Sequence, residues 1–240
     1  MKVGVFDSGI GGLTVLRSLI DRFPNNEYIY YGDTLNVPYG NKSIETLKLL
    51  SSNIMDFLIK KNVDIIIIAC GTISSNLKDY LINKYDIDII DIVSPTINYL
   101  NNSNYNKIGL LATSNTIKSR IFSKNIKKDI KEVECPLFVN MIENNNYADL
   151  KKYIEIYLSD LKDRDLIVLG CTHYPIIKKQ IHEYIPNIEL LDMGDIISLT
   201  NNGKYKLEMY FSKINETILN NINNIIGKYE YIIEEYNDKN

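Results

Sequence analysis

The chain has 240 residues, of which 45% are apolar and 24% are charged, and its formal net charge is −3. This composition is typical of a globular protein large enough for one large or two smaller domains. Basic residues are spread among acidic ones, which argues against a nucleic-acid-binding surface. Three cysteines do not form the disulfide framework of a secreted protein, and they favour a reducing compartment.

The amino terminus, MKVGVFDSG, turns polar after six residues, which is unlike a signal peptide. No apolar stretch approaches the ~20 residues that span a bilayer. We therefore expect a soluble protein of the cytoplasm, with no membrane and no nucleic acid among its partners.

Strands and helices alternate through the first hundred residues, which indicates an α/β fold with parallel sheets and right-handed crossovers. Apolar runs predict strands, and apolar residues at helical spacing predict the helices between them. The turn at 7–12 and the irregular loop at 32–41 follow the first two strands. In chain order we expect strands at 3–6, 27–31, 64–69 and 87–93, and helices at 13–23, 43–61 and 74–84.

The pattern then restarts, which suggests a duplicated α/β unit. The segment KIGLL at 107–111 echoes KVGVF at 2–6, an offset of 105 residues, and the turn residues Asp7-Ser8 are echoed by Ala112-Thr113. Two strands that end in cysteine repeat at a nearly equal offset of 101 residues. Two anchors at similar spacing favour duplication over a coincidence between common strand–turn–helix units.

The Asn- and Ser-rich segment 99–106 is expected to link the two units. After residue 192 the pattern is less regular, and 205–236 is expected to form one or two helices that pack back on the first unit. The sequence therefore predicts a discontinuous first domain, 1–98 plus 207–240, and a second domain, 99–206.

Cys70 and Cys171 each close an apolar strand, in the segments IIIIACGTISS and LIVLGCTHYP. Ligands of open α/β sheets bind at the carboxyl ends of the strands. Each cysteine is expected where its strand gives way to a helix, whose N–H groups favour the thiolate and lower the pKa. A free cysteine can instead be a small buried apolar residue, and this is the interpretation that we favour for Cys135.

Asp7 and His173 lie close to these cysteines in the expected fold. Asp7 could cap the helix that follows or place a carboxylate beside Cys70. His173 stands two residues after Cys171, whereas His182 is expected on the surface. One histidine and two distant cysteines do not match a zinc spacing, so no metal site is expected.

The glycine-rich turn Gly9-Ile10-Gly11-Gly12 lacks both the GxGxxG register and a Walker lysine. A nucleotide site is therefore not favoured. The glycines indicate a tight turn, or close approach of the backbone to a small anion.

Four segments together resemble the glutamate racemase family of the aspartate/glutamate racemases: FDSGIGGLTVL at 6–16, YGDTLNVPYG at 31–40, CPLFVNMIE at 135–143 and LGCTHYP at 169–175. The resemblance runs in order from Lys2 to about Asp192, roughly four-fifths of the chain. It implies two α/β domains with mainly parallel sheets and a substrate held in the cleft between them. It also implies production of D-glutamate for peptidoglycan, and a homodimer.

The resemblance further implies a two-base mechanism that uses no cofactor. Cys70 and Cys171 would face each other across the α-carbon of glutamate, Asp7 would assist Cys70, His173 would assist Cys171, and Glu143 matches the remaining family carboxylate. The substrate-binding residues that the resemblance implies are Asp7, Ser8, Tyr39, Gly40, Gly71, Thr72, Thr172 and His173, with Thr116 as a weaker addition.

Two positions depart from the family pattern. Gly71 stands where the family usually has Asn, and its missing amide would cost the substrate a charge-assisted hydrogen bond worth roughly 1.5–3 kcal/mol. Gly71 is also expected to enlarge the pocket. Met193 stands where the family tends to have Ser.

Other functions stay open on the sequence alone. A racemase of aspartate or of both acidic amino acids is the nearest alternative, and a non-catalytic binding protein of the same fold is another. A thiol hydrolase would leave one cysteine idle. A redox pair would bring the Cα atoms within ~7 Å of each other.

Overall fold

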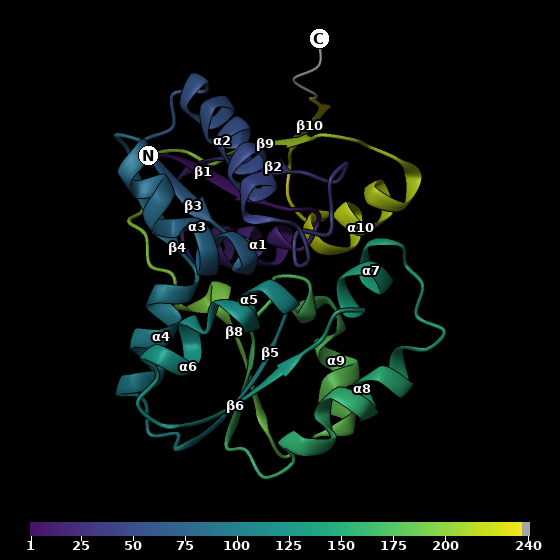
Figure 1. Ribbon diagram of the computed structural model, residues 1–240. Helices are drawn as coiled ribbons and strands as arrows, with labels where there is room; N and C mark the ends of the chain where they lie inside the picture. The colour runs from purple at the N-terminus through teal and green to yellow at the C-terminus, as the bar shows by residue number, and fades with distance from the viewer. Residues whose placement is uncertain (237–240) are drawn as a thin grey trace.

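The computed structural model describes residues 1–236 and contains two parallel sheets, one in each half of the molecule (Figure 1). The first sheet has the order β10-β9-β2-β1-β3-β4, and the second has the order β6-β5-β7-β8. The strands are β1 (Lys2–Asp7), β2 (Glu27–Gly32), β3 (Ile65–Ile68), β4 (Asp88–Asp91), β5 (Lys107–Ala112), β6 (Asp129–Glu134), β7 (Leu166–Leu169), β8 (Glu189–Asp192), β9 (Lys206–Phe211) and β10 (Ile232–Glu235). The predicted α/β fold class with two similar units is confirmed.

The helices fill the connections between these strands and cover the sheets (Figure 1). They are α1 (Gly12–Arg22), α2 (Ile44–Lys60), α3 (Gly71–Lys84), α4 (Val93–Asn102), α5 (Ser114–Ser119), α6 (Ile121–Asn125), α7 (Phe138–Glu143), α8 (Leu150–Leu158), α9 (Lys178–Tyr184) and α10 (Glu216–Ile226), with 3₁₀ turns η1 (Ser159–Leu161), η2 (Tyr174–Ile177) and η3 (Met193–Ile196). Among residues 1–236, no helix combines the length and apolar character needed to cross a membrane.

The strand order supports the expected duplication. β2-β1-β3-β4 in the first sheet has the same order as β6-β5-β7-β8 in the second. Equivalent strands also pair in equivalent register, since Val3 of β1 lies beside Ile65 of β3, and Ile108 of β5 lies beside Leu166 of β7. The strands that precede the two cysteines, β3 and β7, therefore hold the same place in their units.

Both cysteine strands are continuous apolar runs because helices cover both faces of a parallel sheet. Three of the four residues of β3 and all four residues of β7 are buried. Two apolar clusters form the core. The larger one joins residues of both units, and the smaller one packs β3 and Cys70 against α2 and α3.

The C-terminal segment returns to the first sheet, where β9 pairs with β2 and β10 pairs with β9. Of the one or two helices expected over 205–236, one is found as α10, but the two strands that flank it are not predicted from the sequence. The segment packs on the first unit, as expected. The strand KLEMYF buries Leu207, Met209 and Phe211, at every second position. The many Asn and Lys residues around it make this strand pattern hard to recognise in the sequence. The domain boundaries after residues 98 and 206 stay predictions, and residues 237–240 of the first domain lie outside the described residues.

The expected linker 99–106 is wrong in its first half, because 99–102 belong to helix α4. Val93, Thr96 and Leu100 are buried on one face of this helix, at helical spacing. This apolar periodicity outweighs the loop signal of the Asn and Ser residues. The strand expected at 87–93 is likewise shorter, and it ends at Asp91.

A substitution at Leu100 tests whether this segment is a packed helix or an exposed linker. Leu100 is fully buried, so Leu100→Ala should lower the free energy of unfolding by about 2–5 kcal/mol. The neighbouring Tyr99→Ala is the control, because Tyr99 is 37% exposed and should cost less than about 1 kcal/mol. Chemical denaturation measures both. Equal, small effects at the two positions would contradict the packing of α4.

Candidate active site

The carboxyl edges of the two sheets meet at the residues singled out from the sequence. Asp7 ends β1, Cys70 follows β3, and Cys171 follows β7. The two units are joined here by a hydrogen bond in which the Thr172 hydroxyl donates to Asp7 Oδ1 at 3.1 Å. All three cysteines of the chain are free.

Cys70 is the N-cap residue of α3, which begins at Gly71 rather than at residue 74. The expected lowering of its pKa is wrong. Burial raises the pKa of the Cys70 thiol, negative charge on Asp7 and Cys171 raises it further, and the N–H of Ile73 and the hydroxyl of Ser8 only partly oppose this. Desolvation of a side chain that is 4% exposed outweighs the helix N-terminus. Without substrate, Cys70 is therefore a protonated thiol.

Cys171 has a different setting, because a turn and the 3₁₀ helix η2 follow it instead of an α-helix. The prediction that each cysteine precedes the N-terminus of an α-helix is therefore confirmed for Cys70 and wrong for Cys171. The sulfur of Cys171 lies 3.7 Å from Nδ1 of His173. Cys171 packs in the larger apolar cluster and Cys70 in the smaller one, so each thiol is backed by a different part of the core.

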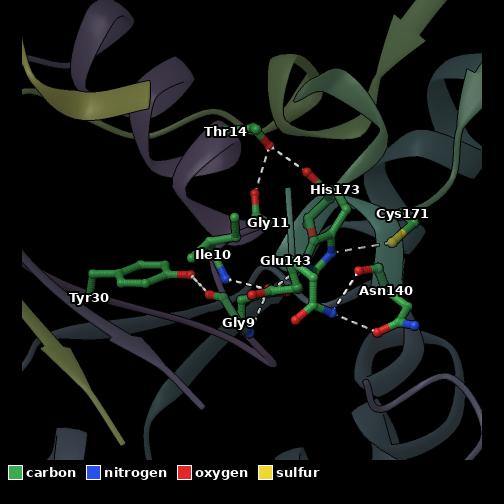
Figure 2. A network of polar contacts seen from close by, with 12 residues as sticks. Gly9, Ile10, Gly11, Thr14, Tyr30, Asn140, Glu143, Cys171 and His173 are labelled. Carbon is green, nitrogen blue, oxygen red and sulfur yellow. Dashed lines mark hydrogen bonds and ion pairs between the residues drawn. The ribbon is translucent and has the colours of Figure 1, made fainter. Parts of the chain in front are cut away.

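His173 connects Cys171 to Glu143, the last residue of α7 (Figure 2). Its Nε2 lies 2.6 Å from Glu143 Oε1, which also accepts the N–H of Ile10 at 2.9 Å. Burial alone would lower the pKa of His173, but its hydrogen bonds to Cys171 and Glu143 and their negative charge raise the pKa well above its ordinary value. The resulting imidazolium stabilises negative charge on the Cys171 sulfur.

Asp7 is completely buried and holds the turn that follows β1. Its carboxylate accepts the N–H of Gly9 at 3.1 Å and that of Gly12. The helix α1 is capped at Gly11 without a side-chain hydrogen bond, so Asp7 is not its N-cap residue. Burial raises the pKa of Asp7, against the opposing effects of His173 and the two N–H groups.

The glycines of this turn allow side chains of the second unit to lie against its backbone. A Cβ atom on Gly9 would be 2.0 Å from Glu143 Oε1, and one on Gly11 would be 2.4 Å from Nδ1 of His173. Figure 2 shows Gly9, Ile10 and Gly11 beside the His173–Glu143 pair. The turn therefore makes room for this pair, and close approach of its backbone to a small anion stays a prediction.

The loop after β2 places Tyr39 and Gly40 against the second unit. The Tyr39 hydroxyl donates to Asp33 Oδ2 at 2.5 Å, while the Gly40 carbonyl accepts the N–H of Asn115 at 2.9 Å. Asn115 Nδ2 also donates to the Tyr39 carbonyl at 3.3 Å. The Tyr39 hydroxyl and the carbonyl oxygens of both residues are thus hydrogen-bonded within the protein.

Three buried hydroxyls form a chain between the units. Thr72 Oγ1 lies 2.9 Å from Thr113 Oγ1, which lies 3.1 Å from Thr116 Oγ1. Thr113 was not among the expected site residues. The repeat contains the signal for it, because Ala112-Thr113 stands where Asp7-Ser8 stands in the first unit.

The larger pocket expected beside Gly71 is not found. A Cβ atom on Gly71 would lie 2.8 Å from the carbonyl oxygen of Gly170 and 3.5 Å from Cε of Met193. The space that a side chain would fill is taken by the second unit.

Cys135 and His182 lie outside the site, one in the core and one on the surface, as expected from the sequence. Cys135 is fully buried, and its sulfur lies 3.6 Å from the carbonyl oxygen of Val133. His182 is exposed on α9.

Proteins named glutamate racemase match nearly the whole length of the chain. A glutamate racemase of a Hydrogenobaculum species is 40% identical over 248 aligned residues, which cover 96% of this chain and 95% of the relative. The crystal structure of the Francisella tularensis glutamate racemase in complex with D-glutamate is 31% identical, with a TM-score of 0.83, and covers 98% of this chain and 97% of that one. The aspartate racemase of Picrophilus torridus, at 19% identity and a TM-score of 0.59, covers 80% of this chain and 89% of that one and shares the fold alone.

The sequence pattern of one family matches residues 12–197, more than three-quarters of the chain. The matched residues contain both cysteines, His173 and Glu143. The chain therefore belongs to the Asp/Glu/Hydantoin racemase family.

Proposed function

We propose that the protein is a glutamate racemase that interconverts L- and D-glutamate by proton transfer between two cysteines and the α-carbon. One observation carries the proposal above all. Two free cysteines follow equivalent strands of a duplicated fold, and each has its own acid–base neighbours, Asp7 for Cys70 and the His173–Glu143 pair for Cys171. A chain 40% identical along nearly its full length carries the same activity in its name.

In one direction of the reaction, Cys171 acts as the base and Cys70 as the acid. In this direction the Cys171 sulfur, as a thiolate, takes the α-proton while the C–H bond breaks. Cys70 begins protonated and donates its proton to the opposite face of the carbanion. The product leaves with inverted configuration, Cys171 is left as a thiol and Cys70 as a thiolate, and proton exchange with solvent returns each to its starting form. For the other enantiomer the roles are exchanged.

An α-carbon next to a carboxylate is a weak acid, so preorganised donors must stabilise the charge that develops. The hydroxyls of Ser8, Thr72 and Thr113 and the N–H groups of the first turn of α3 are suited to hold carboxylate oxygens. We propose substrate contacts for the other residues expected from the sequence as well: Asp7, Tyr39, Gly40, Gly71, Thr116, Thr172 and His173.

The wider role rests on this activity. We propose that the product D-glutamate is used for peptidoglycan, and thus for cell-wall formation and cell shape. The protein would act in the cytoplasm as a homodimer. The mechanism uses no metal and no other cofactor.

Substrate choice is tested by deuterium incorporation at Cα in D2O. Both enantiomers of glutamate should exchange and invert. Aspartate, which is one methylene shorter, should have a kcat/KM lower by about 10–200-fold. Failure of both glutamate enantiomers to exchange would contradict the proposal, and equal or faster turnover of aspartate would show an aspartate or broad-specificity racemase instead.

The two-cysteine mechanism predicts that Cys70→Ser and Cys171→Ser each lower kcat for both directions by about 10³-fold or more, because each removes one of the two proton-transferring groups. Circular dichroism of the reaction mixture measures inversion. Cys135→Ala is the matched control and should keep kcat within about threefold. Activity that survives loss of either site cysteine would refute the two-base assignment.

Glu143 is expected to set the alkaline limit of activity through His173. The raised pKa of His173 keeps the imidazolium at neutral pH, and this charge is lost as pH rises through that pKa. Glu143→Gln removes the negative partner, so the alkaline limb of kcat/KM should move to lower pH. Glu183→Gln, an exposed change on α9, is the control. An unshifted limb in Glu143→Gln would exclude this role.

A further inference from the structure

The residues next to the two site cysteines touch each other. Gly71 directly follows Cys70, and Gly170 directly precedes Cys171. A Cβ atom on Gly71 would lie 2.8 Å from the Gly170 carbonyl oxygen, closer than real Cβ atoms approach such an atom. Even the methyl group of alanine at position 71 therefore requires one of the two backbones to move.

Gly170 has no room to retreat into its own sheet. Its N–H donates to the carbonyl oxygen of Leu111 at 2.8 Å. A Cβ atom on Gly170 would lie 2.5 Å from Leu110 Cδ1 and 2.7 Å from the Leu111 carbonyl oxygen, so β5 packs directly against it. A push from position 71 must therefore move the two turns apart.

Met193 closes another side of the contact. Its Cε would lie 3.5 Å from a Cβ atom on Gly71, and Met193 itself is 3% exposed. Its neighbour Gly194 is held against the first unit, because Arg22 donates to the Gly194 carbonyl at 2.7 Å. The two departures from the family pattern, Gly71 and Met193, thus lie side by side.

We propose that the backbone contact between Gly71 and Gly170 sets the separation of the Cys70 and Cys171 sulfurs. Gly71 is then a positioning residue, and it acts by lacking a side chain. Its effect on catalysis rests on the proposed racemase function, whereas its effect on the sulfur separation does not. Proton transfer depends steeply on position, and a misplacement of about 1 Å can cost about a hundredfold in rate.

The test is Gly71→Ala. Relief of the 2.8 Å contact to an ordinary distance of 3.4 Å requires a movement of about 0.6 Å. Crystal structures of wild type and variant, grown under the same conditions, should show a larger Sγ–Sγ distance between Cys70 and Cys171 in the variant. kcat should fall by about 10–100-fold, while KM changes by less than about threefold.

The matched control is Gly109→Ala in β5, where a Cβ atom would lie 2.9 Å from Ile167 Cγ1. This Cβ atom would meet a side chain instead of backbone, and the change touches neither cysteine turn. It should lower the melting temperature while leaving kcat and the sulfur separation unchanged.

An unchanged sulfur separation in Gly71→Ala would overturn the proposal, and so would an equal loss of kcat in the Gly109→Ala control. If the wild type fails to racemise glutamate, the proposed function fails, but the sulfur separation still tests the contact. The two failures are therefore distinguishable.

Discussion

A buried pair of opposite charges, His173 and Glu143, gives the two cysteines of this site unlike environments. The imidazolium lies beside Cys171, while the nearest acidic group to Cys70 is the buried carboxyl of Asp7. Burying such a pair costs desolvation energy, which only good geometry offsets. The geometry is supplied by Nε2 and Oε1 at 2.6 Å and by the N–H of Ile10, which satisfies the same carboxylate oxygen.

The asymmetry arises within a symmetric scaffold. The strand order is the same in both units, so β3 and β7 bring their cysteines to equivalent edges. The segments after these two strands differ, because Cys70 caps a 14-residue helix and Cys171 precedes a turn and a short 3₁₀ helix. The duplication thus sets where the thiols are, and the segments that follow the two strands set which groups surround each one.

The apolar runs and the two repeated anchors were sufficient to predict the fold class and the strands that deliver the cysteines, because burial in parallel sheets leaves a strong pattern. The sequence does not predict helix α4, because its Asn residues resemble a loop. The pKa direction of Cys70 was wrong because it depends on three-dimensional burial, which the position before a helix does not reveal. The contact between Gly71 and Gly170 joins residues 99 apart in the chain, and no local signal predicts it.

The raised pKa values bear directly on which substrates the site can hold. Glutamate carries two carboxylates and one ammonium group, so a site with ionised Asp7, Glu143 and both thiolates would repel it. Burial raises the pKa of Asp7 and of Cys70, which favours their neutral forms, and the imidazolium of His173 balances Glu143. Fewer negative charges then face the substrate. Desolvation, which opposes the thiolate at Cys70, therefore also reduces the repulsion that an acidic amino acid would meet between the two sulfurs.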